Sequence, residues 1–374
     1  MNILITGACA PISADLAQAL SLAGHRVVMS DSSRWPIGRF SPYSRGFTRT
    51  PAPAKNYAAF VRGIHAILRR EAIDRIIPTS EEVFWLAQDN VISEKLFAPK
   101  FEMLNRLHHK AIFAQMAQDA GAGPVFVTTA TSREDVETIP ASLVAKGLVA
   151  KPVYSRFGSA VLLKPSREEL LSLDFSREWV IQSYVRGTEV CVYAVAQDGG
   201  LRILHAYRPA YRAGPGASVY FEPVADPRID AFVAGFISRH GLTGQISFDV
   251  MLTTDGLVAI ECNPRGTSGI HLASQHPEEF ADALLNPGKP LGGGALPAPR
   301  LLGIPFLAYH GLALFKDKSA RLAWNMAKDA SSEARLPLYS GVLATCELVA
   351  KAALAGVAPT VASTLDFEWN GERG

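Results

Sequence analysis

The chain has 374 residues, of which 48% are hydrophobic and 19% are charged. This length and this amount of apolar material predict two or three folded domains and exclude an intrinsically disordered protein. The formal net charge of +2 provides no basic footprint of the kind that nucleic-acid-binding proteins carry.

The cysteines and the apolar runs bear on the compartment. Four cysteines are scattered without the spacing of a zinc site or a redox pair, so we interpret them as reduced thiols in a cytoplasmic protein. The N-terminus lacks the basic start of a signal peptide. The longest apolar run, from Leu301 to Phe315, is shorter than the roughly 18 residues that a membrane-spanning helix needs. We therefore expect no transmembrane segment.

The first thirty residues predict a unit of strand, helix and strand. Residues 2–6 and 25–30 are apolar strands, and residues 13–23 form the helix between them. This succession predicts the start of a parallel sheet. It is also the layout of a dinucleotide site, but the segment ITGACAPIS has one glycine where the GxGxxG fingerprint has three. A nicotinamide-dependent oxidoreductase is therefore kept as an alternative only.

The next stretch predicts a loop over residues 35–53, a helix over 57–71 and a strand over 75–78. Ser80, Glu81 and Glu82 follow that strand, where open α/β sheets present ligand-binding residues. Glu81 is thus a candidate substrate contact. The alternative is that these residues begin a helix, because acids in the first turn suit the helix dipole.

Residues 101–122 predict one long helix that ends at a glycine. The helix contains the adjacent histidines His108 and His109, which resemble a metal-binding pair. Neighbouring residues point to different faces of a helix, so these two histidines would not chelate one ion.

The stretch from residue 241 to 269 predicts a β-hairpin. Two apolar strands, residues 246–252 and 257–261, flank the tight-turn pair Asp255-Gly256. This arrangement sets Asp249 opposite Glu261, and Asn263 leaves the sheet on the same face as Glu261. Two carboxylates and an amide are oxygen ligands that suit Mg²⁺. Arg265 follows closely, with a planar guanidinium that fits phosphate or carboxylate.

Three further basic residues are candidates for anion binding. Lys151 lies at the end of a predicted apolar strand, residues 148–152, where a buried ammonium is costly unless it meets an anion. Arg208 and Arg212 precede a loop that contains glycine and proline. We expect this loop to close over a substrate whose carboxylate one of the two arginines grips.

Three segments together resemble a known family. The spacing from Asp249 to Asn263, with NPR following, is similar to the metal-binding hairpin of the ATP-grasp superfamily of ATP-dependent carboxylate ligases. KPVYSRFGSAV, residues 151–161, resembles that family's lysine and glycine-rich loop. IQSYVRGTEVCVYAV, residues 181–195, resembles its adenine-binding linker and ribose-binding glutamate. The segments occur in the family's order, and the resemblance covers roughly residues 100–285.

The resemblance implies an α/β protein with an ATP-grasp fold, similar to carbamoyl phosphate synthase and biotin carboxylase, in which two α+β subdomains clasp ATP. We expect a Rossmann-like pre-ATP-grasp domain over residues 1–107 and the ATP-grasp domain over 108–286, with a lid subdomain at about 124–183. A linker and a helical C-terminal extension would occupy residues 287–374. The sequence leaves open whether this tail packs on the N-terminal domain, forms a homodimer contact, or meets a partner or membrane surface.

The resemblance also implies a role for each matching residue. Asp249, Glu261 and Asn263 would hold Mg²⁺, with Mn²⁺ as the alternative ion, while Lys151 and Arg265 would balance charge at the reacting group. The remaining positions would bind ATP: Lys110, Lys151 and Ser159 its phosphates, the backbone of Ser183 and Val185 its adenine, and Glu189 its ribose. The loop departs from the family at residues 155–157, which are Ser, Arg and Phe where glycine is common.

The activity implied is that of a ligase. It would activate a small-molecule carboxylate as an acyl phosphate, join it to an amine or another nucleophile, and release ADP and phosphate. The alternatives are an ATP-grasp carboxylase or carbamoyl phosphate-type enzyme, and a nucleotide-binding protein without turnover. The segment NPRGTSGIHLAS resembles the first of these alternatives. The sequence identifies neither the acid nor the acceptor.

Overall fold

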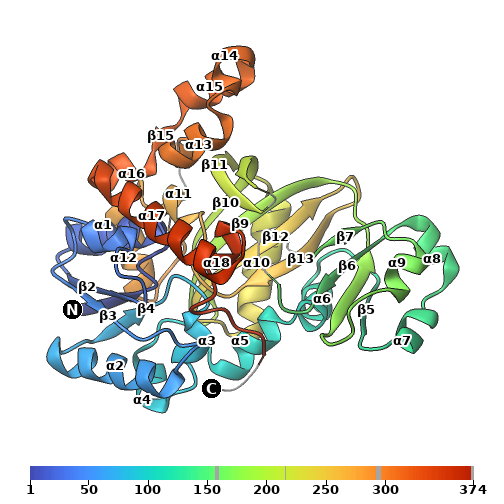
Figure 1. The fold of residues 1–374 in the computed structure, drawn as a ribbon, viewed down its shortest axis with the longest axis horizontal. Coiled ribbons are helices and arrows are strands. Elements are labelled where there is room, and N and C mark those ends of the chain that lie inside the picture. Colours follow the sequence, from blue (N-terminus) through green and yellow to red (C-terminus); the bar gives the residue numbers. More distant parts are fainter. Residues whose placement is uncertain (156–159, 215, 292–295, 372–374) are drawn as a thin grey trace.

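A computed structural model describes residues 1–155, 160–214, 216–291 and 296–371 (Figure 1). Its strands form three sheets. The first has the order β3-β2-β1-β4, the second β13-β12-β9-β10-β11-β14-β15, and the third β5-β8-β6-β7. The predicted α/β class is confirmed, with a parallel sheet at the N-terminus and helices at the C-terminus.

The N-terminal sheet is parallel throughout, as the sequence predicts. Its elements are β1 (Asn2–Thr6), α1 (Ile12–Leu22), β2 (Arg26–Asp31), β3 (Phe47–Arg49), α2 (Tyr57–Arg70) and β4 (Arg75–Ile77). The loop expected over residues 35–53 instead contains the 3₁₀ helix η1 (Ile37–Phe40) and the edge strand β3. A strand of three residues is too short to show the alternation by which strands are recognised.

The single helix predicted over residues 101–122 is two helices. After α3 (Glu82–Leu86) and α4 (Asn90–Lys95), the chain forms α5 (Phe101–His108) and α6 (Lys110–Asp119). His109 has an extended conformation and caps α6, because its Nδ1 accepts the backbone N–H of Ile112 at 3.5 Å. The break makes Lys110 the first residue of α6.

The lid sheet follows. It is built from β5 (Val127–Ala130), α7 (Arg133–Glu137), α8 (Ala141–Lys146), β6 (Leu148–Pro152), β7 (Leu162–Leu163), α9 (Arg167–Leu171) and β8 (Trp179–Ser183). β6 lies between β7 and β8, and its residues Leu148 and Ala150 pack into the lid core. Lys151 follows these apolar positions near the end of β6, so its backbone is held by the packed strand.

The central sheet carries the predicted hairpin. Its elements are β9 (Thr188–Gln197), β10 (Gly200–Ala213), β11 (Ala217–Val224), α10 (Pro227–His240), β12 (Gly244–Leu252) and β13 (Leu257–Asn263). Ile246, Phe248 and Val250 of β12 pack in a core that also contains side chains of α6 and α10. Side chains alternate between the faces of a strand, so Ser247 and Asp249 leave the sheet on the opposite face. That face is free to form a site.

The C-terminal part adds both strands and helices. It contains α11 (Ile270–Ala273), α12 (Pro277–Leu285), β14 (Arg300–Leu301), α13 (Gly303–His310), α14 (Ala313–Lys316), α15 (Lys318–Met326), β15 (Lys328–Asp329), α16 (Ala330–Glu333), α17 (Leu338–Ala355) and α18 (Pro359–Ala362). The chain does not continue as one helix from α11 into α12, since Pro277 cannot donate the hydrogen bond that would continue the first helix. β14 pairs with β11 and β15 with β14, which extends the central sheet.

The end of the chain returns to the N-terminal domain (Figure 1). Trp369 is fully buried beside Phe84, Trp85 and Phe101. Its indole Nε1 donates to Asn105 Oδ1 at 3.0 Å. The end of the tail thus packs on the N-terminal domain, which is one of the alternatives that the sequence left open.

Candidate functional site

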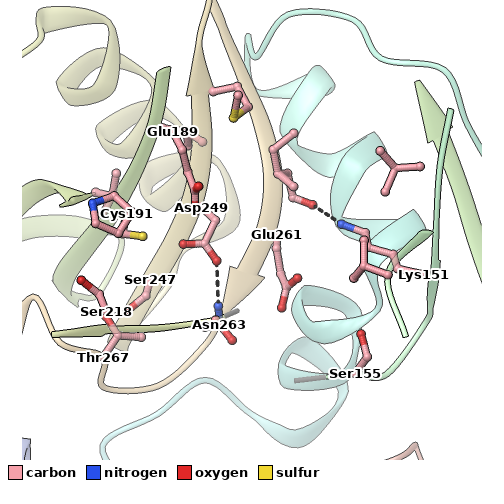
Figure 2. Close-up of a pocket in the computed structure, with 18 of the residues that line it drawn as sticks. Lys151, Ser155, Glu189, Cys191, Ser218, Ser247, Asp249, Glu261, Asn263 and Thr267 are labelled. Carbon is pink, nitrogen blue, oxygen red and sulfur yellow. Dashed lines mark hydrogen bonds between the residues drawn. The ribbon is translucent and has the colours of Figure 1, made fainter. Parts of the chain in front are cut away.

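A cavity of about 780 Å³ lies where the lid, the segment after β8 and the exposed face of the central sheet meet (Figure 2). Most of the residues singled out in the sequence line this cavity: Lys151, Ser183, Val185, Glu189, Arg212, Asp249, Glu261, Asn263 and Arg265. Lys110, Arg208 and Glu81 do not line it, and Ser159 lies outside the described residues.

The hairpin of β12 and β13 brings together the residues that the sequence singled out. Asp249 pairs with Glu261, and Ser247 pairs with Asn263. The amide Nδ2 of Asn263 donates to Asp249 Oδ2 at 3.4 Å, so the two side chains meet on the cavity face (Figure 2). Asp249, Glu261 and Asn263 therefore converge from two neighbouring strands.

A β-bulge connects the hairpin to the lid. The pairing shifts after Asp249, because Val250 lies opposite Ala259 and Ile260 is the extra residue. The carbonyl oxygen of Ile260 accepts a hydrogen bond from Lys151 Nζ at 3.3 Å (Figure 2). A backbone oxygen at the bulge thus orients the lid lysine toward the hairpin.

Two buried lysines surround Glu261. Lys110 is 1% exposed, and its Nζ donates to the carbonyl oxygen of Val153 at 3.0 Å and lies 3.8 Å from Glu261 Oε1. Lys110 therefore lies behind Glu261 and touches the chain that follows β6. Burial lowers the pKa of Lys151 to about 8, and the nearby Glu261 opposes this shift. The ammonium of Lys151 would be stabilised by an anion in the cavity.

The two carboxylates of the hairpin differ electrostatically. Burial raises the pKa of Glu261, but Lys110, Lys151 and other cations lower it more, so the net pKa lies below the ordinary value. Burial, and then the neighbouring charge of Glu261, raise the pKa of Asp249 to about 6. Glu261 is the carboxylate held in its charged form, whereas Asp249 is destabilised in that form until a cation offsets its charge.

The donor set fits a hard divalent cation. Beside the carboxylates of Asp249 and Glu261, the hairpin offers the amide oxygen of Asn263 as a third candidate donor. Mg²⁺ takes few protein ligands and completes its shell with water and phosphate.

Arg265 lies at the end of the hairpin. Its Nη2 donates to Asn263 Oδ1 at 3.1 Å and lies 3.8 Å from Glu81 Oε1. Glu81 is 2% exposed, and its Oε2 accepts the backbone N–H of Trp369 at 3.0 Å. Glu81, a candidate substrate contact by sequence, is therefore placed behind Arg265, where it links this arginine to the end of the chain.

The other end of the cavity is lined by the segment that joins the lid to the central sheet. The backbone N–H of Ser183 donates to the carbonyl oxygen of Phe126 at 3.0 Å, and that of Tyr184 donates to the carbonyl oxygen of Gly147 at 3.0 Å. Both partners belong to the lid, so these contacts fix the start of the segment against it. Ser183 and Val185 are held there at the cavity wall, where the adenine is expected.

A paired glutamate follows this segment. Glu189 Oε1 lies 2.6 Å from Arg212 Nη2, and both residues line the cavity. Arg212, one of the two arginines expected to grip a substrate carboxylate, is thus paired at the end of the cavity where the ribose is expected.

Arg208 has a different environment from Arg212. Tyr207 and Pro209 line the cavity, whereas Arg208 is exposed on the other face of β10 and lies opposite Glu222 of β11. The segment before the glycine-proline turn is a long strand of the central sheet. The alternation of this strand directs Arg208 away from the cavity.

Some lining residues were missed in the sequence. Ser247 and Cys191 lie beside Asp249 (Figure 2), and strand alternation could have found Ser247, two residues before Asp249. The Oγ of Ser247 donates to the carbonyl oxygen of Arg265 at 3.0 Å and so supports the loop after β13. Thr364 reaches the cavity wall from the C-terminal segment, for which no local pattern gives a signal.

One family model matches the central part of the chain. Residues 121–269 match the family model described as the ATP-grasp domain. This range contains the lid, the linker and the hairpin, and therefore every residue named above that lines the cavity except Thr364. A search of the curated proteins found no match by sequence.

Solved structures share the fold over most of the chain. N5-carboxyaminoimidazole synthetase from Staphylococcus aureus, complexed with ADP, is 15% identical with a TM-score of 0.64, and the match covers 84% of this chain and 86% of that chain. L-amino acid ligase from Bacillus licheniformis is 16% identical, with a TM-score of 0.63 and 80% of both chains covered. Biotin carboxylase from Campylobacter jejuni is 14% identical, with a TM-score of 0.62 and 77% and 72% covered. The predicted ATP-grasp fold is thereby confirmed.

Proposed function

The chain carries an ATP-grasp domain, and we propose that it is an ADP-forming ligase that activates a small-molecule carboxylate with ATP and joins it to an amine. The observation that carries this proposal is the convergence of Asp249, Glu261 and Lys151 on one cavity. Two carboxylates and an ammonium from opposite walls are the charges that a cation-bound triphosphate requires.

We assign the nucleotide to the end of the cavity between the lid and β9. The backbone of Ser183 and Val185 would contact the adenine, and the carboxylate of Glu189 would accept hydrogen bonds from the ribose hydroxyls. The ion pair with Arg212 supports this role, because it fixes the Glu189 side chain at the cavity wall. The phosphates would then extend toward Lys151 and the hairpin.

Asp249, Glu261 and Asn263 are the residues that would hold Mg²⁺ at the phosphates. A divalent ion bound there would offset negative charge on the transferred phosphoryl group. Lys110 and Lys151 hold Glu261 in its charged form, which keeps this carboxylate available as a ligand. Asn263 is positioned by Arg265 through the contact of 3.1 Å.

The chemistry has two balanced steps. A carboxylate oxygen of the acid attacks the γ-phosphorus, the bond from this phosphorus to the β,γ-bridging oxygen breaks, and ADP leaves. The amine then attacks the carbonyl carbon of the acyl phosphate, inorganic phosphate leaves, and the amine loses a proton. In this proposal Arg265 orients the acid with its planar guanidinium, and Lys151 offsets charge on the phosphoryl oxygens.

The turn after β1 does not favour the alternative of a nicotinamide-dependent enzyme. A Cβ atom at Gly7, in the turn after β1, would lie 2.3 Å from Thr79 Oγ1 and 2.8 Å from Glu82 Oε1. A carboxylate so close to this turn disfavours a pyrophosphate there, because both groups are negative. Carboxylation is the rival within the family, since biotin carboxylase shares the fold with the ligases.

The experiment is a screen for ATP-dependent products. The protein is incubated with ATP, Mg²⁺ and pooled small carboxylic acids and amino acids, and the products are analysed by mass spectrometry. We expect a new amide mass that depends on ATP and is absent with Glu261→Gln. A parallel reaction with bicarbonate would instead give a carboxylated product if the enzyme is a carboxylase. Binding of NADH without any ATP-dependent product would overturn the proposal.

A further inference from the structure

Exposed hydrophobic side chains are concentrated over the C-terminal helices. Of the nineteen large hydrophobic residues exposed in the described part of the chain, thirteen lie between Ile304 and Val361. Single exposed apolar residues are normal on any protein, but contiguous apolar surface marks a place where something binds. The exposed side chains of the C-terminal helices therefore indicate a binding surface.

The distribution of charged and apolar residues in helix α17 is the reverse of that in an ordinary surface helix. Its only charged residues point into the protein: the carboxylate of Glu347 accepts the backbone N–H groups of Arg34 at 2.7 Å and Trp35 at 2.6 Å, and Lys351 lies 2.9 Å from Asp366. Surface helices usually direct charges to water and apolar residues to the core. In α17 the outward side is apolar instead.

The outward residues of α17 recur at helical spacing. Tyr339, Val342 and Val349 are 58%, 57% and 52% exposed, and Cys346 between them is also exposed. Residues three and four apart lie on one side of a helix, so these side chains form one stripe. Leu338, four residues before Val342 and 82% exposed, extends it to the start of the helix.

A second apolar element contacts α17. Helices α13 to α15 form an arm that projects from the body of the molecule at the top of Figure 1. Leu312 and Phe315 on this arm are 81% and 83% exposed. At its base, a Cβ atom placed on Gly341 of α17 would lie 3.1 Å from Ile304 Cδ1 of α13. The arm and the stripe together are called the C-terminal apolar surface.

The arm also carries positive charge. Lys316, Lys318 and Arg321 follow Phe315 closely and are exposed, and the guanidinium of Arg321 donates to the carbonyl oxygen of Phe315 at 3.3 Å. The acid in this stretch is Asp317, which caps α15 by accepting the N–H of Ser319 at 2.8 Å. Cations beside apolar tips are the composition of elements that lie in the interface of an anionic membrane.

We propose that the C-terminal apolar surface docks onto an anionic lipid bilayer. Leu312 and Phe315 enter the acyl boundary, the basic residues of the arm contact lipid phosphates, and the stripe of α17 lies along the interface. The charge on the arm favours a bilayer over a second copy of this chain. The exposed cations Lys316, Lys318 and Arg321 lie beside the apolar tips, and lipid phosphates would complement their charge.

Docking at the surface fits α17 better than crossing the membrane. Among the described residues α17 is the helix that is long and apolar enough to span, with 18 residues and a mean hydropathy of 1.4. A spanning position would break the contacts of Glu347 with the loop between β2 and η1, and those of Lys351 with Asp366. It would also pull on Trp369, which is buried in the N-terminal domain. These contacts hold α17 along the surface of the protein.

The test is co-sedimentation of the full chain with vesicles of phosphatidylcholine, with and without phosphatidylglycerol. We expect binding to the vesicles that contain phosphatidylglycerol, which weakens with added salt. Leu312→Asp combined with Phe315→Asp should weaken this binding about tenfold or more. Lys316→Glu combined with Lys318→Glu should remove the preference for the anionic lipid. Matched controls are Leu22→Asp and Val91→Asp, since both residues are 53% exposed but lie in the N-terminal domain.

Three results would overturn the proposal. The first is no sedimentation with either vesicle, and the second is equal binding by the arm variant and the controls when all of them unfold at the wild-type temperature. The third is a concentration-dependent dimer in analytical ultracentrifugation that Val342→Asp with Val349→Asp dissociates. That result would assign the surface to a second copy of this chain.

Discussion

The ammonium of Lys110 lies 3.8 Å from the carboxylate of Glu261, and the lysine is 1% exposed. The first residue of α6 and a residue near the end of β13 are thus joined across the wall of the cavity. With Lys151 on the other side, this contact keeps Glu261 charged in spite of its burial. Glu261 is therefore the residue on which the proposed cation site depends most.

Replacement of this carboxylate by an amide of the same shape tests that dependence. Glu261→Gln removes one negative charge between two lysines, and ATP turnover should fall about a hundred- to thousandfold while the protein stays folded. The measurement is release of phosphate from ATP at saturating Mg²⁺. Glu222→Gln is the control, because Glu222 lies in the same sheet but outside the cavity. Near-normal turnover by Glu261→Gln would refute the assignment.

The sequence predicted the hairpin well because its signals are local. The pair Asp255-Gly256 fixes the turn, and the alternation before and after it fixes which side chains share a face. The pairing of Asp249 with Glu261 also depends on the β-bulge at Ile260, for which the sequence contains no signal. Lys151 was identified for a similar reason, since a lysine in an apolar strand is unusual wherever the strand packs.

Long-range packing explains what the sequence could not reveal. The residues around His109 have a helical pattern, so the sequence does not reveal the interruption there. The position of Glu81 behind Arg265 depends on how the N-terminal domain packs against the hairpin. Thr364 lines the cavity and Trp369 packs in the N-terminal core, although their segment contains no recognisable motif. Their roles follow from contacts between residues far apart in the chain, which local patterns do not encode.

Lys151 should make nucleotide binding depend on pH. Its pKa is lowered to about 8, mainly by burial, so the ammonium loses its proton as the pH rises through this value. The affinity for MgATP should be highest between about pH 6 and 8, because above this range the neutral amine no longer attracts phosphate and below it Asp249 is protonated. Isothermal titration across this range measures the effect. In Lys151→Arg the guanidinium stays charged and the fall above about pH 8 should disappear; its persistence would assign the titration to another group.

Glu189 should recognise the ribose. In Glu189→Gln the charged acceptor is lost, and the KM for ATP should rise about tenfold or more while kcat changes little. Wild-type protein should also discriminate against 2′-deoxyATP, and the variant should treat both nucleotides alike. A double-mutant cycle with this substrate pair isolates the contact. Discrimination that survives in the variant would place the ribose elsewhere.

Trp369 should anchor the end of the chain. Its indole is fully buried against Phe84 and Trp85 and donates a hydrogen bond to Asn105. Trp369→Ala should lower the free energy of unfolding by about 3–5 kcal/mol. Trp369→Phe, which keeps most of the apolar contact, should cost less. Denaturant titrations compare the two variants, and a wild-type midpoint for Trp369→Ala would show that the tail contributes no stability.

The formation of an acyl phosphate is the central claim, and the fate of oxygen from the acid tests it most directly. The acid found in the product screen is labelled with ¹⁸O in its carboxylate, and the nucleotide and the phosphate are then analysed by mass spectrometry. The account predicts ADP as the nucleotide product and one ¹⁸O atom in the released phosphate. AMP as the product, with no label in inorganic phosphate, would mean that the acid is adenylated and would contradict the proposed mechanism.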